Sequence, residues 1–238
     1  MVRSLSLKLD WATYKSAKYA VEHWHYSKCM PNGKLTRIGV WEDNNFIGVV
    51  LFGRGACNHL LTQYGLKITE GCELVRVALD KHKTPVTKII SIAIKMLKKQ
   101  APKLKLIVSF ADNRQKHLGK IYQAGNWIYT GCIHSTPEYY VDKKCIHERT
   151  LGHKKGKWTH VRTININIAT GRMTKDVVKN LPKRDGGYRY RYLYPLDKDI
   201  KNKIEKLRKP YPKSCDSSLI KTPSIQEGDG VKSTLSHQ

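Results

Sequence analysis

The feature that most constrains the fold of this chain is a strand–helix–strand pattern in its middle. Residues 73–79 (ELVRVAL) and 104–110 (LKLIVSF) are apolar runs of strand length. Between them, apolar side chains repeat at helical spacing over residues 86–100, and Pro102 then ends the helix. Strands that alternate with helices in this way predict a mixed sheet whose faces are covered by helices.

Elements on both sides of this pattern extend the α/β order. They are strands over residues 2–9, 36–42, 46–52, 127–132 and 139–147, a helix over residues 12–24, and a helix that ends near residue 124. Asp10 is expected to cap the first helix. The turn residues 43–45 predict a hairpin between two of the strands.

The sequence therefore predicts one α/β domain over residues 1–150, with a mixed central sheet flanked by helices. Ligands of such sheets bind beyond the carboxyl ends of the strands. In this chain those positions are the segments that follow Leu79 and Phe110.

The chain is strongly basic, with 44 Lys and Arg against 19 Asp and Glu and a net charge of +25. Residues 143–213 alone hold 21 Lys and Arg against 6 Asp and Glu. Such an excess repels itself in a compact protein, so a polyanionic partner, foremost nucleic acid, is expected. A solvated basic surface and a membrane face are the alternatives.

Beyond the α/β domain, we expect a basic, aromatic-rich extension over residues 151–213 that packs on the core or on DNA, and a disordered tail over residues 214–238. The segment 187–194 (GYRYRYLY) offers arginines for phosphates and tyrosines for bases. It is equally typical of a strand with its tyrosines inside and its arginines outside. The candidate DNA contacts are Lys34, Arg54, Arg189, Tyr190 and Arg191.

Membrane and secretion signals are not recognised in the sequence. The most apolar runs have the length of strands or core helices, and the first ten residues lack the pattern of a signal peptide. Six scattered cysteines are expected to be reduced thiols. We therefore expect a cytoplasmic protein without a membrane partner.

A local motif follows the strand at residues 104–110. Asn113 comes directly after this strand, Tyr122 lies on the next helix, and Asn126 and Trp127 stand four and five residues further on. This motif resembles the GNAT acyltransferase superfamily, which implies an acyl-CoA-like donor and a role for Tyr122 as general acid near the thioester. The segment 82–88 (HKTPVTK) departs from the superfamily's glycine-containing phosphate signature. The residues expected to hold the donor are Lys83, Thr84, Thr87, Lys88 and Asn113.

Segments spread over nearly the whole chain carry a closer resemblance. They are HYS (25–27), PNGK (31–34), GVVLFGRGA (48–56), ELVRVAL (73–79), VSFAD (108–112), GKIYQAGNWIYTG (119–131), HERT (147–150), RYLYPLDK (191–198) and PYPK (210–213). Together they resemble the phage Mom family of DNA adenine-modification proteins. The resemblance implies a GNAT-like transferase that adds a carbamoylmethyl (methylcarbamoyl or acetamido) group to the exocyclic N6 amine of adenine in double-stranded DNA. It also implies protection of phage DNA from host restriction, an involvement of iron, and a location in the cytoplasm of a phage-infected or prophage-bearing bacterium.

The implied product constrains the chemistry. Attack of an amine on an acyl thioester gives an amide, whereas a carbamoylmethyl group is joined through a methylene carbon, so the donor is unusual or a second step follows. The target amine belongs to a stacked base, so the enzyme must flip the base or melt the duplex. A conventional GNAT acetyltransferase acting on a protein, tRNA or small amine, and a non-catalytic DNA-binding protein on this scaffold, are the alternatives.

Placement along the predicted elements gives the candidate catalytic residues, which are His25, Tyr26, Arg76, Ser109, Asp112 and Tyr122. Asp112 is expected to act as general base or metal ligand, or merely to cap the following helix, and Ser109 is alternatively a core residue. A guanidinium within a strand, as at Arg76, needs an anionic partner such as Glu73, Asp112 or a substrate.

Two metal sites are conceivable from the sequence. His25, Asp112 and His117 form a two-His-one-carboxylate set for the iron that the family resemblance implies. Cys132-x-His134 and Cys145-x-His147 would form a Cys2His2 zinc site if their strands paired as a hairpin, an arrangement that we regard as the weaker of the two.

Overall fold

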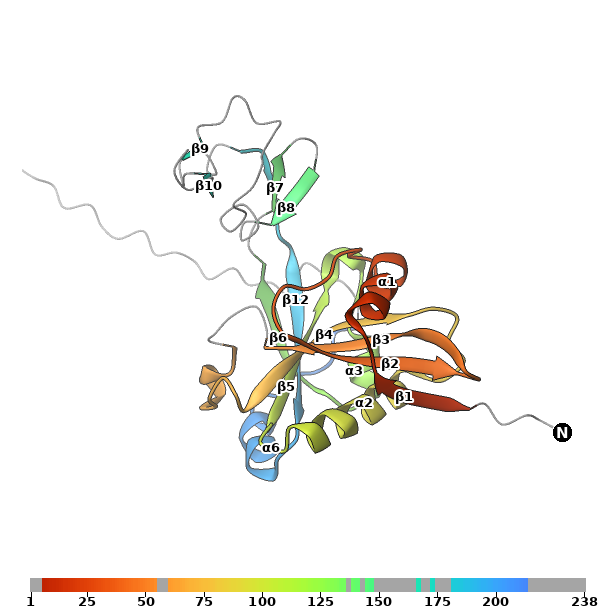
Figure 1. Ribbon diagram of the computed structural model, residues 1–238. Helices are drawn as coiled ribbons and strands as arrows, with labels where there is room; N and C mark the ends of the chain where they lie inside the picture. The colour runs from red at the N-terminus through yellow and green to blue at the C-terminus, as the bar shows by residue number, and fades with distance from the viewer. Residues whose placement is uncertain are drawn as a thin grey trace, which may run out of the picture.

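The computed structural model describes residues 6–54, 60–135, 138–141, 144–147, 166–167, 172–173 and 181–213. Its centre is a seven-stranded sheet in the order β1-β2-β3-β4-β5-β12-β6 (Figure 1). The strands of this sheet are β1 (Leu7–Trp11), β2 (Leu35–Glu42), β3 (Asn45–Gly53), β4 (Gly71–Leu79), β5 (Leu106–Asp112), β6 (Ile128–His134) and β12 (Tyr188–Pro195). The helices are α1 (Tyr14–Trp24), α2 (Val86–Gln100), α3 (Lys120–Ala124) and α6 (Lys198–Glu205), with 3-10 turns η2 (Thr62–Tyr64) and η3 (Asn113–Gln115). The predicted mixed sheet with flanking helices is confirmed, and its elements follow in the predicted order as far as β6.

The strands β4 and β5 separate along their length. They pair in parallel only from Gly71 to Leu74, opposite Leu106 to Ser109, although β4 continues to Leu79 and β5 to Asp112. The other pairs of this sheet are antiparallel. A bulge between β3 and β4 shifts the register, so that Leu51 lies opposite Arg76 and Phe52 opposite Leu74. Bulges bend a strand and re-aim its side chains, and this one lies where the two strands diverge.

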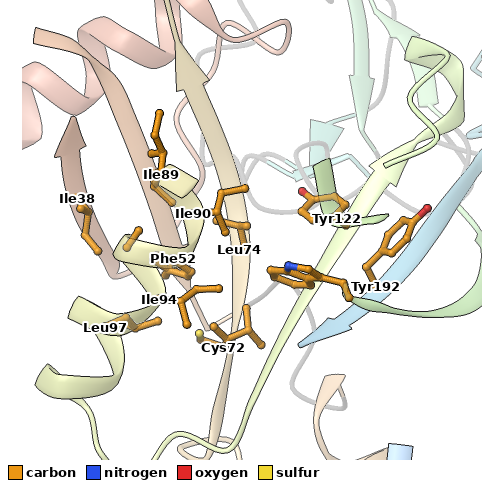
Figure 2. Packing of buried hydrophobic residues seen from close by; sticks show 14 of the residues in the cluster. Ile38, Phe52, Cys72, Leu74, Ile89, Ile90, Ile94, Leu97, Tyr122 and Tyr192 are labelled. Carbon is orange, nitrogen blue, oxygen red and sulfur yellow. The ribbon is translucent and has the colours of Figure 1, made fainter. Parts of the chain in front are cut away.

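The helices α2 and α3 cover one face of the sheet. The apolar positions of α2 repeat at helical spacing and are buried, as the sequence predicts: Ile89, Ile90, Ala93, Ile94 and Leu97. They pack against Phe52 and Leu74 from the strands and against Tyr122 from α3 (Figure 2). This core fixes α3 beside the diverging ends of β4 and β5.

The opposite face is shared by two groups of elements. α1 packs Ala17, Ala20 and Val21 over β3 and β4, while η2 and α6 cover β5 and β12 through residues such as Leu61 and Ile204. Register across β3, β4 and β5 places both groups on the same face. The separation of β4 from β5 therefore lies between α1 on one side and η2 and α6 on the other.

The strand β12 lies between β5 and β6 and pairs antiparallel with both. We expected this segment in an extension that packs on the core or on DNA, and the structure places it inside the main sheet. Tyr190 and Tyr192 are buried in the core shared with α2 and α3, while Arg189 and Arg191 lie on the other face. The strand alternative for this segment, with its tyrosines inside, is the one observed.

Several local expectations are wrong in detail. Thr13, and not Asp10, caps α1, because the Thr13 hydroxyl accepts a bond from Ser16 N at 3.1 Å, whereas Asp10 pairs with Gly39 inside the sheet. The single strand expected over residues 139–147 is two strands, β7 (Glu138–Val141) and β8 (Lys144–His147), which form a three-stranded sheet with β11 (Lys183–Arg184). The hairpin turn is confirmed, with positive φ at both Asp43 and Asn44 as a two-residue turn requires.

The remaining strands, β9 (Ile166–Asn167) and β10 (Arg172–Met173), pair with each other. The tail expected over residues 214–238 lies outside the described residues, as does most of 151–180. Among the helices of the described ranges, none combines the length and apolar character that a membrane crossing demands.

Candidate active site at the divergence of β4 and β5

The residues singled out by the sequence meet where β4 and β5 separate, which we call the β4–β5 site: His25, Tyr26, Arg76, Ser109, Asp112, His117, Tyr122 and Arg189. Arg76 is in register with Leu51 below α1, and Asp112 is in register with Arg189 on β12. These side chains therefore project from the sheet face that lies between α1 and α6. Ser109 and Tyr122 belong to the opposite, α3 side.

The loop after α1 places two aromatic side chains over this site. His25 caps the C-terminus of α1 and is buried, whereas Tyr26 is 47% exposed. The ring of Tyr26 lies 4.3 Å from that of His25 and 5.3 Å, edge-on, from that of His117. Burial raises the pKa of Tyr26, against the opposing effect of positive charges that include Arg76 and Arg189. The charges of Arg76 on β4 and Arg189 on β12 therefore both act on Tyr26, which follows α1.

The protonation state of His25 follows from its neighbours. Ser27 N donates to Nδ1 of His25 at 3.1 Å, and the Ser27 hydroxyl lies 2.7 Å from the same atom. Because a backbone N–H can only donate, Nδ1 is an acceptor and the proton of the neutral ring is on Nε2. Burial, and then the positive charge of Arg76, lowers the pKa of His25 to about 3. His25 is therefore a neutral residue that presents an N–H.

The hydroxyl of Tyr122 is held by Ser109 between the two strands. Ser109 is fully buried, and its Oγ lies 2.8 Å from Leu74 O and 2.7 Å from the Tyr122 hydroxyl. The carbonyl can only accept, so Ser109 donates to it and Tyr122 donates to Ser109. Burial raises the pKa of Tyr122 to about 12, which keeps the phenol protonated. Ser109, which is bonded to Leu74 O, is a positioning residue for Tyr122. Tyr122 and Leu74 belong to the same core (Figure 2).

Arg76 enters the site just after the bulge in β4. One terminal nitrogen donates to Val75 O at 2.7 Å. Its Nε is shielded from solvent and has no hydrogen-bond partner in the described part of the chain. The partners that the sequence suggested within the protein, Glu73 and Asp112, form no ion pair with Arg76. The guanidinium is thus held by the backbone with part of its donor capacity unused.

Asp112 is committed to an ion-pair network. Its carboxylate accepts bonds from the backbone N of Arg114 at 3.0 Å and from the guanidinium of Arg114 at 3.0 and 3.2 Å. Arg114 also pairs with Glu138 at 2.8 Å, and Glu138 pairs with Arg184 at 2.7 Å. Of the two roles considered for Asp112, the structure shows the cap, here at the start of η3. The network joins β5 to the small sheet of β7 and β11.

The loop expected to hold a donor diphosphate is bound by a carboxylate of the protein itself. Glu42 is 5% exposed and accepts the backbone N–H groups of Lys83 at 2.9 Å and Thr84 at 2.7 Å. Burial alone would raise the pKa of Glu42, but these bonds outweigh it and lower the pKa. An anion already occupies the amides of Lys83 and Thr84, so these residues do not fit a diphosphate.

The other expected donor contacts are dispersed. Thr87 and Lys88 line a cavity of about 310 Å³ between α2 and α3, whose wall includes Asn126 and Trp127. Asn113 is used structurally, since its side-chain oxygen accepts Tyr188 N at 2.8 Å. The donor-binding set is therefore not assembled at one place.

The residues proposed for metals do not fit a metal in this arrangement. Both oxygens of Asp112 are engaged by Arg114, and Nδ1 of His25 is engaged by Ser27. No group of three His, Cys, Asp or Glu side chains suited to a metal ion exists among the described residues. The zinc hypothesis required two paired strands, but Cys132 and His134 lie on β6, which pairs with β12, whereas Cys145 and His147 lie on β8, which pairs with β7.

The five candidate DNA contacts divide into two groups. Lys34 and Arg54 are exposed, and Arg189 lies half-buried at the β4–β5 site. Tyr190 is buried in the core, which leaves no ring face for a base, and Arg191 is bound by Thr130 at 2.8 Å and Gln63 at 3.0 Å. The last two are therefore structural in this conformation.

Two functional details are missed by the sequence reasoning. Ser27, which sets the tautomer of His25, lies within the HYS segment and could have been found there. Glu42 lies 41 residues from Lys83, and no local pattern links the two.

Comparisons with known proteins identify relatives of this chain. The chain is 26% identical over 220 residues to the protein named methylcarbamoylase mom of Escherichia phage Mu. The aligned region covers 88% of this chain and 85% of the relative. Solved structures similar to it include a protein assigned as an acetyltransferase from Acinetobacter baylyi, with a TM-score of 0.44 and 12% identity over 84% of this chain and 97% of that one. Another similar structure is an acetyltransferase from Bacillus subtilis, with a TM-score of 0.40 and 11% identity. The match covers 82% of this chain and 100% of that one. The model of the Mom protein family matches residues 6–213, and the chain belongs to this family.

Proposed function

We propose that this protein is a transferase that adds a carbamoylmethyl group to the exocyclic N6 amine of adenine in double-stranded DNA, and that it thereby shields phage DNA from host restriction. The observation that carries the proposal is the family match over residues 6–213, which includes every residue of the β4–β5 site. The name of the phage Mu relative, a methylcarbamoylase, supports the nature of the transferred group.

The chemistry of the β4–β5 site is compatible with this reaction. A bond between N6 and a methylene carbon forms as the bond from that carbon to the leaving group breaks. The leaving group departs with the electron pair, and the proton that N6 loses passes to the leaving group or to water. Neutral His25 offers an N–H that stabilises negative charge developing on a leaving group, and protonated Tyr122 adds a second donor once its O–H turns away from Ser109. Asp112 is paired with Arg114 and is not assigned the role of base. The commitment of Lys83 and Thr84 to Glu42 disfavours a donor held through a diphosphate at that loop.

The substrate must present its adenine outside the base stack. Tyr26 provides an exposed ring at the edge of the site, flanked by His25 and His117, on which an extruded base can stack. Lys34, Arg54 and Arg189 are assigned to the phosphate backbone on either side.

The test is nucleoside analysis of DNA from cells that express the full chain. Enzymatic digestion and mass spectrometry are expected to reveal carbamoylmethyl-deoxyadenosine that cells with an empty vector lack. An acetylated small amine or protein with unmodified DNA would favour the conventional acetyltransferase. Tight DNA binding with an unmodified adenine pool would favour a non-catalytic binder.

A further inference from the structure

Hydrogen-bond donors exceed acceptors at the β4–β5 site. Arg76 has an unpartnered, solvent-shielded Nε, and His25 offers an Nε2–H that has no partner in the described residues. Tyr26 adds a hydroxyl at the rim. A buried N–H without an acceptor is unfavourable, so a site with several unused donors suits a ligand that only accepts.

Positive charge also exceeds negative charge there. The network of Asp112, Glu138, Arg114 and Arg184 balances itself. Arg76 and Arg189 form no ion pair within the described ranges, and both act on the pKa of Tyr26. The charges that act most on His25 are all positive: Arg76, His117 and Lys28.

Two half-buried guanidinium groups that form no ion pair within the described ranges therefore act on one tyrosine, although Arg189 lies opposite Asp112, which is bound by Arg114. Such groups bind carboxylate or phosphate in bidentate fashion. Positive groups crowded in this way repel one another unless an anion joins them. The ligand that satisfies both the donors and the charge is an oxyanion.

We infer that the β4–β5 site binds an oxyanion, a carboxylate or a phosphate, between Arg76 and Arg189 and beside Tyr26 and His25. The inference deepens the proposed function and rests on it for the two sources of this group. One source is a backbone phosphate of the nucleotide that carries the extruded adenine. The other is an acidic group on the donor of the carbamoylmethyl unit.

Two variants of the full chain, Arg76→Gln and Arg189→Gln, test the inference. The matched control is Arg37→Gln, because Arg37 is also half-buried in the same sheet but donates to Ala12 O at 3.2 Å and Leu35 O at 3.3 Å. Arg76→Lys keeps the charge without the bidentate fork and reports on Arg76 should the Gln variant fold poorly. Circular dichroism verifies folding of each.

Two probes distinguish the sources. The first is a duplex with one unpaired adenine, whose affinity is measured over a range of salt. If the anion is a DNA phosphate, each site variant binds about 10- to 100-fold more weakly, and the slope of log K against log salt becomes shallower by about 0.9. The second probe is sodium acetate or sodium sulfate. Its binding is measured as a saturable rise in the melting temperature of the protein. If the anion belongs to the donor, the site variants lose this rise and keep the wild-type DNA slope.

Either pattern supports the oxyanion site, provided that Arg37→Gln matches wild type. Site variants that match Arg37→Gln with both probes would overturn it. Neither probe depends on adenine chemistry. Unmodified DNA with an intact anion site would therefore count against the proposed function alone, and modified DNA without anion binding would count against this inference alone.

Discussion

The imidazole of His25 and the carboxylate of Glu42 are both held by backbone N–H groups, and these bonds fix the state of each side chain. Ser27 N makes Nδ1 of His25 an acceptor, and the amides of Lys83 and Thr84 require Glu42 to be ionised. The first bond gives the β4–β5 site a neutral donor. The second bond set occupies the backbone amides of Lys83 and Thr84, which were the expected phosphate contacts. In each case the backbone, and not another side chain, decides the chemistry.

For His25 we predict a single neutral tautomer throughout the physiological range. Its pKa is lowered to about 3, so the ring remains uncharged from pH 8 down to pH 5. Nitrogen-15 NMR of labelled protein is expected to show Nδ1 as the unprotonated nitrogen with shifts that do not change over this range. Free histidine added to the sample serves as the control, since an ordinary imidazole titrates in this range. A His25 signal that titrates near pH 6.5 would contradict the assignment.

For Glu42 we predict a contribution to stability that acid removes. The folded pKa lies below the ordinary value of 4.5, so the stabilisation is full above that pH and is lost as the pH falls through the folded pKa. Glu42→Gln loses one of two charged hydrogen bonds, about 2 kcal/mol, and should lower the melting temperature by about 4–8 °C at pH 7. The matched control is Glu22→Gln, whose carboxylate is exposed and 3.7 Å from Lys18. An equal difference between wild type and Glu42→Gln at pH 7 and pH 3 would refute the role.

At the scale of elements, what the sequence predicts depends on how local the signal is. The strand–helix–strand unit of β4, α2 and β5 is predicted because its periodicity lies within each segment. The position of β12 between β5 and β6 is not predictable in this way, because strand order depends on contacts over about 80 residues. The same limit explains Asp112: its position after β5 predicts both a base and a cap, and only the contact with Arg114 distinguishes them.

The position of β12 predicts how truncations behave. A chain that ends at residue 180 lacks the strand that pairs with both β5 and β6, so it exposes two sheet edges and the core around Trp127. It is expected to lose cooperative thermal unfolding, whereas a chain of residues 1–213 retains it. Differential scanning calorimetry of the two chains measures this. Cooperative melting of the shorter chain at the temperature of the longer one would show that β12 is dispensable.

At the scale of the whole molecule, a charge of +25 surrounds a site that is itself positive. Charge of this kind attracts a polyanion to the whole surface, whereas the β4–β5 site determines which part of the polyanion is bound there. Long-range attraction and local selection respond differently to salt, because salt screens the first much more than the second.

We therefore predict steep salt dependence for the binding of unmodified duplex DNA. A protein that contacts six or more phosphates loses about a thousandfold in affinity between about 50 and 200 mM salt. Fluorescence anisotropy with a labelled duplex measures it, and Tyr122→Phe should follow the wild-type curve because Tyr122 is buried. A loss of less than tenfold would indicate that the excess charge does not serve DNA binding.

The most direct measurement of the central claim is the adenine pool of DNA from cells that express wild-type protein, Tyr122→Phe or Tyr64→Phe. Both tyrosines are buried, but Tyr122 donates to Ser109 in the β4–β5 site, whereas Tyr64 lies in η2 and its hydroxyl has no partner in the described chain. Mass spectrometry is expected to find carbamoylmethyl-deoxyadenosine with wild type and Tyr64→Phe, and at least about tenfold less with Tyr122→Phe. Unmodified adenine in all three, with each protein folded and bound to DNA, would contradict the account.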